Sequence, residues 1–301
     1  MTDFRNIVLT GAGFTRAFCS DAPLMHNAIG KTICHAFSSQ LLNSSKASIC
    51  KTYALYRSLR HFKYDDIEDM FDLYFELEKK LRGGGLSSEE FEFKSNFGRF
   101  KMAFTHLLDS TTPWGSDQIA ERCKGNEANI EYFQNGLKDY LQITLNYDTL
   151  IESLLDFYPE PDDHKCQIQH LHGSLGWGLG IDGKIKNLGN NDRGYSSVMA
   201  SEDERLILTS KKEEMFGRYS WYKDKYNVIE EYFKNAEKIF IIGCNVDRDE
   251  SIIKLLENGD GQVIYVCKED KKPEFFKRLD GGRVKPIING GFEPGCLDRY
   301  L

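Results

Sequence analysis

Three short segments place residues that could do chemistry directly after apolar, β-branched runs. They are a glycine loop at residues 11–13, the pair Asn146 and Asp148, and His172, which a glycine follows. Open α/β sheets bind their ligands at the carboxyl ends of parallel strands, so we expect these segments to lie together. Amide and carboxylate groups can stabilise developing charge, and a neutral imidazole can accept a proton near neutral pH. The sequence therefore predicts a polar site at one edge of a sheet.

The glycine loop is typical of a turn that holds a phosphate. Glycines let the backbone approach a pyrophosphate closely, and the helix that follows points its free N–H groups at the negative charge. A full G-x-G-x-x-G fingerprint would need glycine at position 16, which is Arg16, and an acidic residue about 20 residues on, at the end of a second strand. The segment Leu24–Phe37 offers neither. Hydride transfer from a nicotinamide cofactor is therefore a poor fit, and nucleotide binding competes with a purely structural strand–helix turn.

The other polar residues also have structural alternatives. Asp148 can cap the helix expected to begin near Thr149, whereas Asn146 is less easily explained by capping. His170 faces the same side as His172 but deeper in its strand, which favours a structural role for His170. A further apolar run ends in Gly243-Cys244-Asn245, again a polar tip with a glycine for close approach.

The elements that must position these residues follow from the apolar runs. Short β-branched runs bounded by turns predict buried parallel strands. Five are clear and two are weaker: Asn6–Thr10, Leu141–Asn146, Arg205–Ser210, Lys238–Cys244 and Gln262–Cys267, then Cys166–Gly173 and Lys285–Asn289.

Helical stretches between these runs predict an α/β fold with a Rossmann-like, doubly wound parallel sheet. Helical spacing without strands over residues 21–139 predicts a helical insertion between the first two strands, as in Asp65–Leu81 and Phe93–Ser110. We expect one domain over residues 1–301, with its nucleotide-binding core in residues 1–20 and 140–301. The polar, glycine-rich segment Gly180–Ser197 predicts a long loop or short hairpin.

Composition excludes several classes of function. The chain is 41% hydrophobic and 28% charged with a net charge of −7, so we expect no direct nucleic-acid binding. No apolar run approaches the roughly 18 residues that span a bilayer, and no signal peptide is evident, so we expect a cytoplasmic protein without membrane contact. The eight cysteines form no C-x-x-C pair, so we expect neither structural zinc nor disulfides.

The order of the motifs resembles the sirtuin (SIR2) superfamily. A glycine-alanine-glycine turn, a T-x-N-x-D element, an L-H-G element and an apolar strand ending in I-G-x-N follow one another from about Ile7 to Val266. The likeness is greatest to the zinc-free SIR2-like NAD-hydrolysing proteins of bacterial anti-phage defence. The cysteine pairs of the deacylases are absent, the sirtuin P-D-F-R is replaced by "SDAPLMHNAIG", and Leu145 stands where deacylases have glutamine.

This resemblance implies roles for individual residues. Asn146 and Asp148 would flank the nicotinamide ribose of NAD, and His172 would be the catalytic base. The remaining positions would bind the rest of NAD: Gly11, Ala12, Gly13 and Thr15 around the pyrophosphate, Gly243, Cys244 and Asn245 at the adenosine half, and Cys267 and Lys268 near the adenine.

The implied function is NAD hydrolysis to nicotinamide and ADP-ribose, as the toxic effector of an anti-phage system that depletes NAD. Such an enzyme must be held inactive, so the resemblance also implies a homo-oligomer or a partner protein such as a defence ATPase. The aromatic helix Asp65–Leu81 could supply that contact, although a packed core helix is the simpler interpretation. Two alternatives are a module that senses NAD or ADP-ribose without turnover, and an NAD-dependent protein deacylase.

Overall fold

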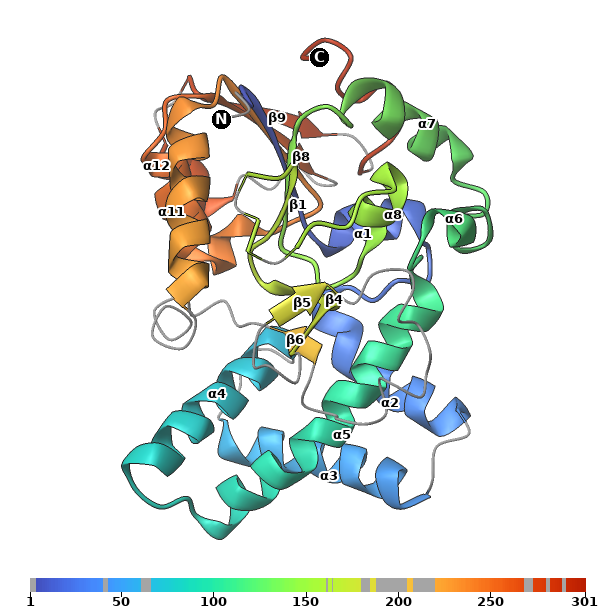
Figure 1. Ribbon diagram of the computed structural model, residues 1–301, viewed down its shortest axis with the longest axis vertical. Helices are drawn as coiled ribbons and strands as arrows, with labels where there is room; N and C mark the ends of the chain where they lie inside the picture. Colours follow the sequence, from blue (N-terminus) through green and yellow to red (C-terminus); the bar gives the residue numbers. More distant parts are fainter. Residues whose placement is uncertain are drawn as a thin grey trace.

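The computed structural model describes residues 4–39, 43–60, 66–160, 162–163, 165–179, 185–187, 205–207, 220–267, 273–279, 282–288 and 291–301. Its centre is a six-stranded, all-parallel sheet in the order β3-β2-β1-β7-β8-β9 (Figure 1). The strands are β1 (Asn6–Thr10), β2 (Leu141–Thr144), β3 (Ile168–His170), β7 (Lys238–Ile242), β8 (Gln262–Cys267) and β9 (Val284–Ile288). Chain order reverses between β1 and β7, which gives the strand order of a Rossmann-like sheet. The predicted fold class is confirmed.

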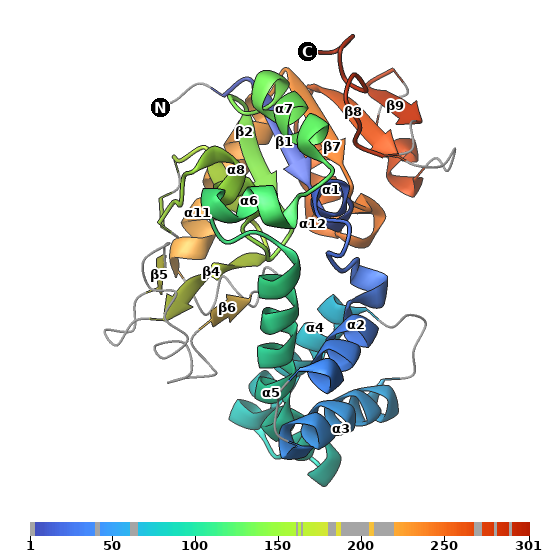
Figure 2. The ribbon, with the colours of Figure 1, turned by 90° about the vertical axis from the view of Figure 1, so that its right-hand side faces the viewer.

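Helices cover both faces of the sheet because the strand side chains alternate between two buried sides. Ile7 and Leu9 of β1 belong to one core and Val8 belongs to the other. One face carries α11 (Ser220–Asn235), α12 (Glu250–Glu257) and the short helix η2 (Glu274–Lys277). The other carries α1 (Ala12–Phe18), α7 (Glu127–Gly136) and α8 (Leu150–Leu155), with α6 (Ser116–Arg122) beside α8 (Figure 2).

A second body of helices lies below the sheet and has its own core (Figures 1 and 2). We call α2 (Met25–Ser38), α3 (Asn43–Leu59), α4 (Ile67–Gly83) and α5 (Ser88–Thr111) the helical module. Its core is rich in phenylalanine and includes Tyr147, which comes from the loop after β2. The Tyr147 ring lies 6.0 Å from the Phe71 ring and 6.3 Å from the Phe104 ring. The loop that carries Asn146 and Asp148 is thus packed into the helical module.

The strand predicted at Arg205–Ser210 is not part of the parallel sheet. Its described residues form β6 (Arg205–Ile207), which pairs antiparallel with β4 (Gly173–Leu179). β4 also pairs antiparallel with β5 (Ile185–Asn187), so these strands form a separate three-stranded sheet. That prediction is wrong because a short apolar run indicates a strand without indicating its partner. β5 supplies a hairpin strand within the predicted loop Gly180–Ser197, whose other residues from 180 on lie outside the described ranges.

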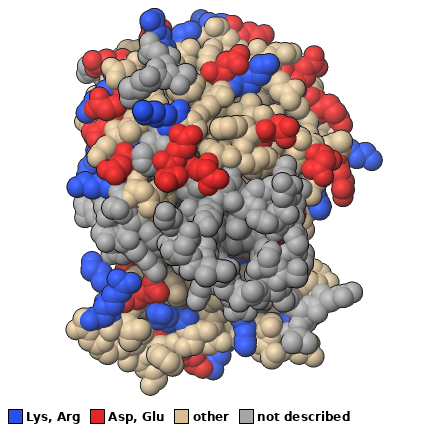
Figure 3. All heavy atoms as spheres, in the orientation of Figure 1, with Lys and Arg blue, Asp and Glu red and all other residues tan. Residues whose placement is uncertain are grey.

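The weaker strand candidates, in contrast, complete the parallel sheet. β3 lies within Cys166–Gly173 at one edge, and β9 overlaps Lys285–Asn289 at the other. Among the described helices, none combines the length and the hydrophobicity needed to span a membrane. On the face drawn in Figure 3, lysine and arginine side chains lie among aspartate and glutamate side chains, without a continuous basic patch over the described residues.

Candidate active site

Two adjoining cavities open at the carboxyl ends of the central strands. The smaller has a volume of about 270 Å³ and the larger about 510 Å³. They share the walls where the glycine loop after β1 meets the loop after β7. The shared residues are Gly13, Leu24, Gly243, Cys244 and Asn245. Chain order reverses between β1 and β7, where open α/β sheets bind ligands.

Packing within the protein already requires the glycines of this loop, before any ligand is considered. A Cβ on Gly11 would lie 2.3 Å from Cys244 Cβ, and a Cβ on Gly13 would lie 2.9 Å from Gly243 Cα. The Gly13 amide donates to the Gly243 carbonyl at 2.8 Å, which fixes one loop against the other. Gly243 itself has φ +68°, and a Cβ there would lie 2.0 Å from the backbone nitrogen of Phe14. Contact of this loop with a pyrophosphate stays a prediction, and two of its amides, those of Gly11 and Gly13, already donate to backbone carbonyls.

Asn146 and Asp148 come together on the hydroxyl of Thr15. Thr15 Oγ1 donates to Asp148 Oδ2 at 2.9 Å and accepts from Asn146 Nδ2 at 2.8 Å. The carboxylate only accepts, so the single hydroxyl proton goes to Asp148 and Asn146 must present its nitrogen. The Asn146 side chain is therefore oriented with Nδ2 toward Thr15, and its Oδ1 is not used by Thr15. Asn146 lines the smaller cavity, whereas Thr15 and Asp148 stand behind it.

Asp148 also contacts the start of α8, although the N-cap residue of that helix is Thr149 and not Asp148. Its Oδ1 accepts from the Leu150 amide at 3.1 Å, in the first turn of α8. Burial raises the pKa of Asp148 to about 6, although the Leu150 amide and the Thr15 hydroxyl both favour the charged form. Asp148 therefore ties α1 to α8 and orients Asn146 through Thr15.

His172 lies in the smaller cavity between two carboxylates. Its Nε2 lies 2.9 Å from Asp249 Oδ2, and its Nδ1 lies 3.3 Å from Glu68 Oε1. Nδ1 is buried, and within the part of the chain that the structure describes no group meets it in hydrogen-bonding geometry. Burial alone would lower the pKa of His172, but Asp249 and Glu68 outweigh it and raise the pKa to about 9. The imidazole is therefore charged at neutral pH in this arrangement. His170 is 2.6 Å from Glu152, a buried pair away from the cavity.

Sequence reasoning missed Asp249, Glu68 and Asp66, which all line the smaller cavity. Asp249 is the N-cap of α12, and its Oδ1 accepts from the amides of Ser251 and Ile252 at 3.0 and 3.2 Å. Asp66 is the N-cap of α4 and accepts from the Glu68 amide at 3.0 Å. Both segments carry the usual signal of a helix start, an acidic residue before an apolar run. That signal predicts a cap and says nothing of a site.

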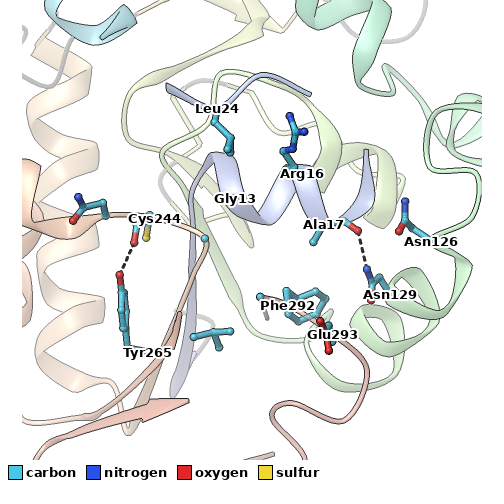
Figure 4. A pocket seen from close by; sticks show the side chains of 14 residues that line it. Gly13, Arg16, Ala17, Leu24, Asn126, Asn129, Cys244, Tyr265, Phe292 and Glu293 are labelled. Atoms are coloured by element: carbon cyan, nitrogen blue, oxygen red, sulfur yellow. Dashed lines mark hydrogen bonds between the residues drawn. The ribbon is translucent and has the colours of Figure 1, made fainter. Parts of the chain in front are cut away.

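The remaining predicted residues divide between the cavities. Ala12 lines the smaller one with Gly11 and Gly13. Figure 4 shows the larger one, where Tyr265 donates to the Cys244 carbonyl at 3.2 Å and Asn129 to the Ala17 carbonyl at 2.7 Å. Arg16, to which the sequence assigned no role, lines this cavity too. The Cys267 side chain and the whole of Lys268 lie outside the described residues.

The larger cavity is bounded by polar and aromatic groups. Its lining includes Tyr265, Phe292 and Glu293 together with Arg16 and Asn126 (Figure 4). Within the part of the chain that the structure describes, no three His, Cys, Asp or Glu side chains are grouped as metal ligands.

Comparison with known proteins gives no family assignment. Neither a protein-family model nor a curated protein sequence matches this chain. Among solved structures it is similar to a Sir2 enzyme from a study of Sir2 mechanism and regulation, at 13% identity and a TM-score of 0.45. That match covers 98% of this chain and 90% of the Sir2 chain.

Two further Sir2 structures also match this chain. Sir2Tm bound to a propionylated peptide matches at 12% identity and a TM-score of 0.45, over 98% of this chain and 90% of its own. Sir2Af2 bound to a myristoylated histone peptide matches at 11% and 0.36, over 98% of this chain and 88% of its own. A likeness at this identity and TM-score carries no weight for function, which has to be inferred from the motifs and the site.

Proposed function

We propose that this chain is an NAD glycohydrolase, which uses water to cleave NAD into nicotinamide and ADP-ribose. The observation that carries the proposal is the smaller cavity, where Asn146 and His172 lie with the glycine loop and with three carboxylates. The order of the sirtuin-like motifs supports NAD as the substrate. The larger cavity, which adjoins the first at Gly13 and Gly243, is then the place for the adenosine half.

The charge of the smaller cavity suits this reaction. Nicotinamide leaves as a neutral ring, and the positive charge passes to the ribose in an oxocarbenium-like transition state. Asp66, Glu68 and Asp249 line the cavity, and the basic side chains among its described lining residues are His26 and His172. Fixed negative groups around a developing positive charge lower the barrier, because they are oriented before the reaction begins.

The chemical step balances with water as the only co-reactant. Water forms a bond to C1′ of the ribose while the bond from C1′ to the nicotinamide nitrogen breaks and its electron pair stays with the ring. One proton leaves the attacking water. We assign its acceptance to the neutral form of His172, in which Asp249 accepts from the protonated Nε2 and Nδ1 keeps the accepting lone pair. Asn146, held by Thr15, orients the water or the ribose with its Oδ1.

The biological role that we propose is NAD depletion by the toxic effector of an anti-phage defence system. It rests on the resemblance of the motifs to SIR2-like defence proteins. Control of such an enzyme would come from self-assembly or from a partner protein such as a defence ATPase. The helical module is the natural place for that contact, since its core is separate from the two cores of the sheet.

The experiment is product analysis with the purified chain and NAD. We expect nicotinamide and ADP-ribose from wild type, and a loss of about 100-fold or more in Asn146→Ala and His172→Ala. Asn235→Ala and His35→Ala are the matched controls, because Asn235 is exposed on α11 and His35 lies in the last turn of α2.

The alternatives give different products. A thermal shift with intact NAD and no nicotinamide would refute hydrolysis in favour of a sensing module. Nicotinamide that appears only with an acylated peptide would refute it in favour of a deacylase.

A further inference from the structure

The helical module places a carboxylate beside Nδ1 of His172, the ring nitrogen that Asp249 does not contact. Glu68 lies in the first turn of α4, and its Oε1 is 3.3 Å from His172 Nδ1. The Glu68 side chain is 25% exposed, whereas that of His172 is 2% exposed. The Glu68 backbone is fixed in turn, because its amide donates to the side chain of Asp66. The contact therefore joins a long side chain in the first turn of α4 to a buried ring that follows β3.

The geometry on both sides of the ring determines its proton. Asp249 accepts at Nε2, so a neutral His172 would carry its proton there and leave a lone pair on Nδ1. That lone pair would face the oxygen of Glu68, which as a carboxylate has no proton to donate. The Nδ1 lone pair and the Glu68 carboxylate repel each other at this distance. A proton added to Nδ1 turns this repulsion into attraction.

We propose that Glu68 is a positioning residue that keeps His172 protonated, so that the helical module restrains the imidazole from accepting a proton. The inference rests on the proposed function, in which His172 accepts the proton of the attacking water. The helical module would act on the site through Glu68, because withdrawal of Glu68 removes the charge that favours a proton on Nδ1 and leaves the Nδ1 lone pair open to the cavity.

No other charged group around His172 occupies the same position among the described residues. Asp249 acts on the opposite nitrogen, and Asp66 is engaged as the cap of α4. His26 lines the same cavity from α2 and carries no negative charge that could favour a proton on His172. The Tyr147 ring is 6.5 Å from the His172 ring, and burial raises the pKa of Tyr147, so it stays neutral.

Tyr147 ties this arrangement to the core of the helical module. It packs against Phe71 of α4, one turn along the helix from Glu68. A displacement of α4 would therefore disturb the Glu68–His172 pair and the Asn146–Tyr147–Asp148 loop together.

The test compares Glu68→Gln with Glu78→Gln. Glu78 lies on the same helix and pairs with Lys94 at 3.7 Å, so its replacement changes the charge of α4 without touching the site. The seven histidines are followed by NMR titration of their ring resonances, and His172→Gln identifies the signal of His172. We expect the pKa of His172 to fall by about one unit or more in Glu68→Gln and to stay unchanged in Glu78→Gln.

Nicotinamide release gives the second readout. The pKa of His172 is raised above 7, so the neutral form is the minor one at pH 7, and each unit by which the pKa falls raises its fraction up to about tenfold. Glu68→Gln should therefore release nicotinamide faster at pH 7, with the acid limb of the pH profile moved to lower pH.

Each outcome decides the matter. An unchanged pKa of His172 in Glu68→Gln overturns the proposal, and so does a fall in pKa that leaves release at pH 7 unchanged or slower. If no variant releases nicotinamide, the proposed function fails on its own, while the titration still shows whether Glu68 holds the proton.

Discussion

Asp249→Asn should abolish turnover while leaving the fold intact. Asp249 uses its two oxygens for different purposes, because Oδ1 caps α12 and Oδ2 holds His172 Nε2. Asparagine caps helices about as well as aspartate, so its Oδ1 can keep the amides of Ser251 and Ile252. Its NH₂ group then stands where Oδ2 was, 2.9 Å from Nε2 in the wild-type geometry. Nε2 must become an acceptor, which moves the proton of a neutral His172 to Nδ1.

The magnitude follows from that tautomer change. With its proton on Nδ1, the imidazole presents an N–H to Glu68 and to the cavity and can accept nothing from water. The same change in a Ser-His-Asp triad lowers kcat by about 10⁴-fold, and we expect a loss of about 10³-fold or more here. Stability should fall by only about 1–2 kcal/mol, since one charge-assisted hydrogen bond is exchanged for a neutral one.

The assay is kcat for nicotinamide release at several pH values, together with urea unfolding of each variant. Asp247→Asn is the matched control, because Asp247 accepts from the amides of Glu274 and Phe275 at 3.0 and 2.8 Å and lies on the same segment. A variant at Asp249 that is folded and retains release within threefold of wild type would refute the assignment of His172 as the base. A loss of the same size in Asp247→Asn would show that the segment, and not the dyad, is sensitive.

Two further predictions concern stability. Gly243→Ala should destabilise the chain by about 3 kcal/mol or more in urea unfolding, because its Cβ would lie 2.0 Å from the backbone nitrogen of Phe14. Gly125 also has a positive φ but lies in open space, so Gly125→Ala should cost only about 1 kcal/mol. Equal losses of stability in the two variants would contradict the packing argument. The raised pKa of His172 should stabilise the fold fully below pH 6.5 and lose that contribution, up to about 3 kcal/mol, as pH rises through about 9. Urea unfolding of wild type and His172→Gln at pH 6 and pH 9 measures this contribution. Burial lowers the pKa of Lys225 to about 8, but both proteins contain Lys225, so its effect on stability cancels in the comparison. Equal losses of stability in the two proteins between pH 6 and pH 9 would show that His172 contributes nothing.

The sheet could be predicted because each buried parallel strand is an apolar run in its own right. β1 and β8 match their predicted ranges, and even the weaker runs mark the two edge strands. Arg205–Ser210 shows the limit of that signal. A run of similar composition joins β4 in a different sheet, because pairing depends on which backbone edge is free nearby and composition does not record it.

The candidate site was predictable only where its residues follow a strand directly. Asn146 and His172 come just after β2 and β3, so the parallel direction of those strands is enough to bring them to one cavity. Asp148 also follows β2, and the same geometry leaves it behind the cavity, because its carboxylate is turned to Thr15 and to the start of α8. Position after a strand thus selects a neighbourhood, while hydrogen bonds within the loop select which side chain faces the cavity.

Glu68 and Asp249 had no such signal, since each begins a helix and acidic residues are common there for local reasons. What turns a capping segment into part of the site is the packing of its helix. α12 lies on the face of the sheet beside β7, and α4 is held through Phe71 against Tyr147, the residue between Asn146 and Asp148. The two carboxylates on His172 therefore come from opposite sides, one from the sheet core and one from the helical module. Asp249 is held by a helix that packs in the core of the sheet, whereas Glu68 is held by the helical module. Glu68 is therefore the carboxylate through which we propose that the helical module acts on His172.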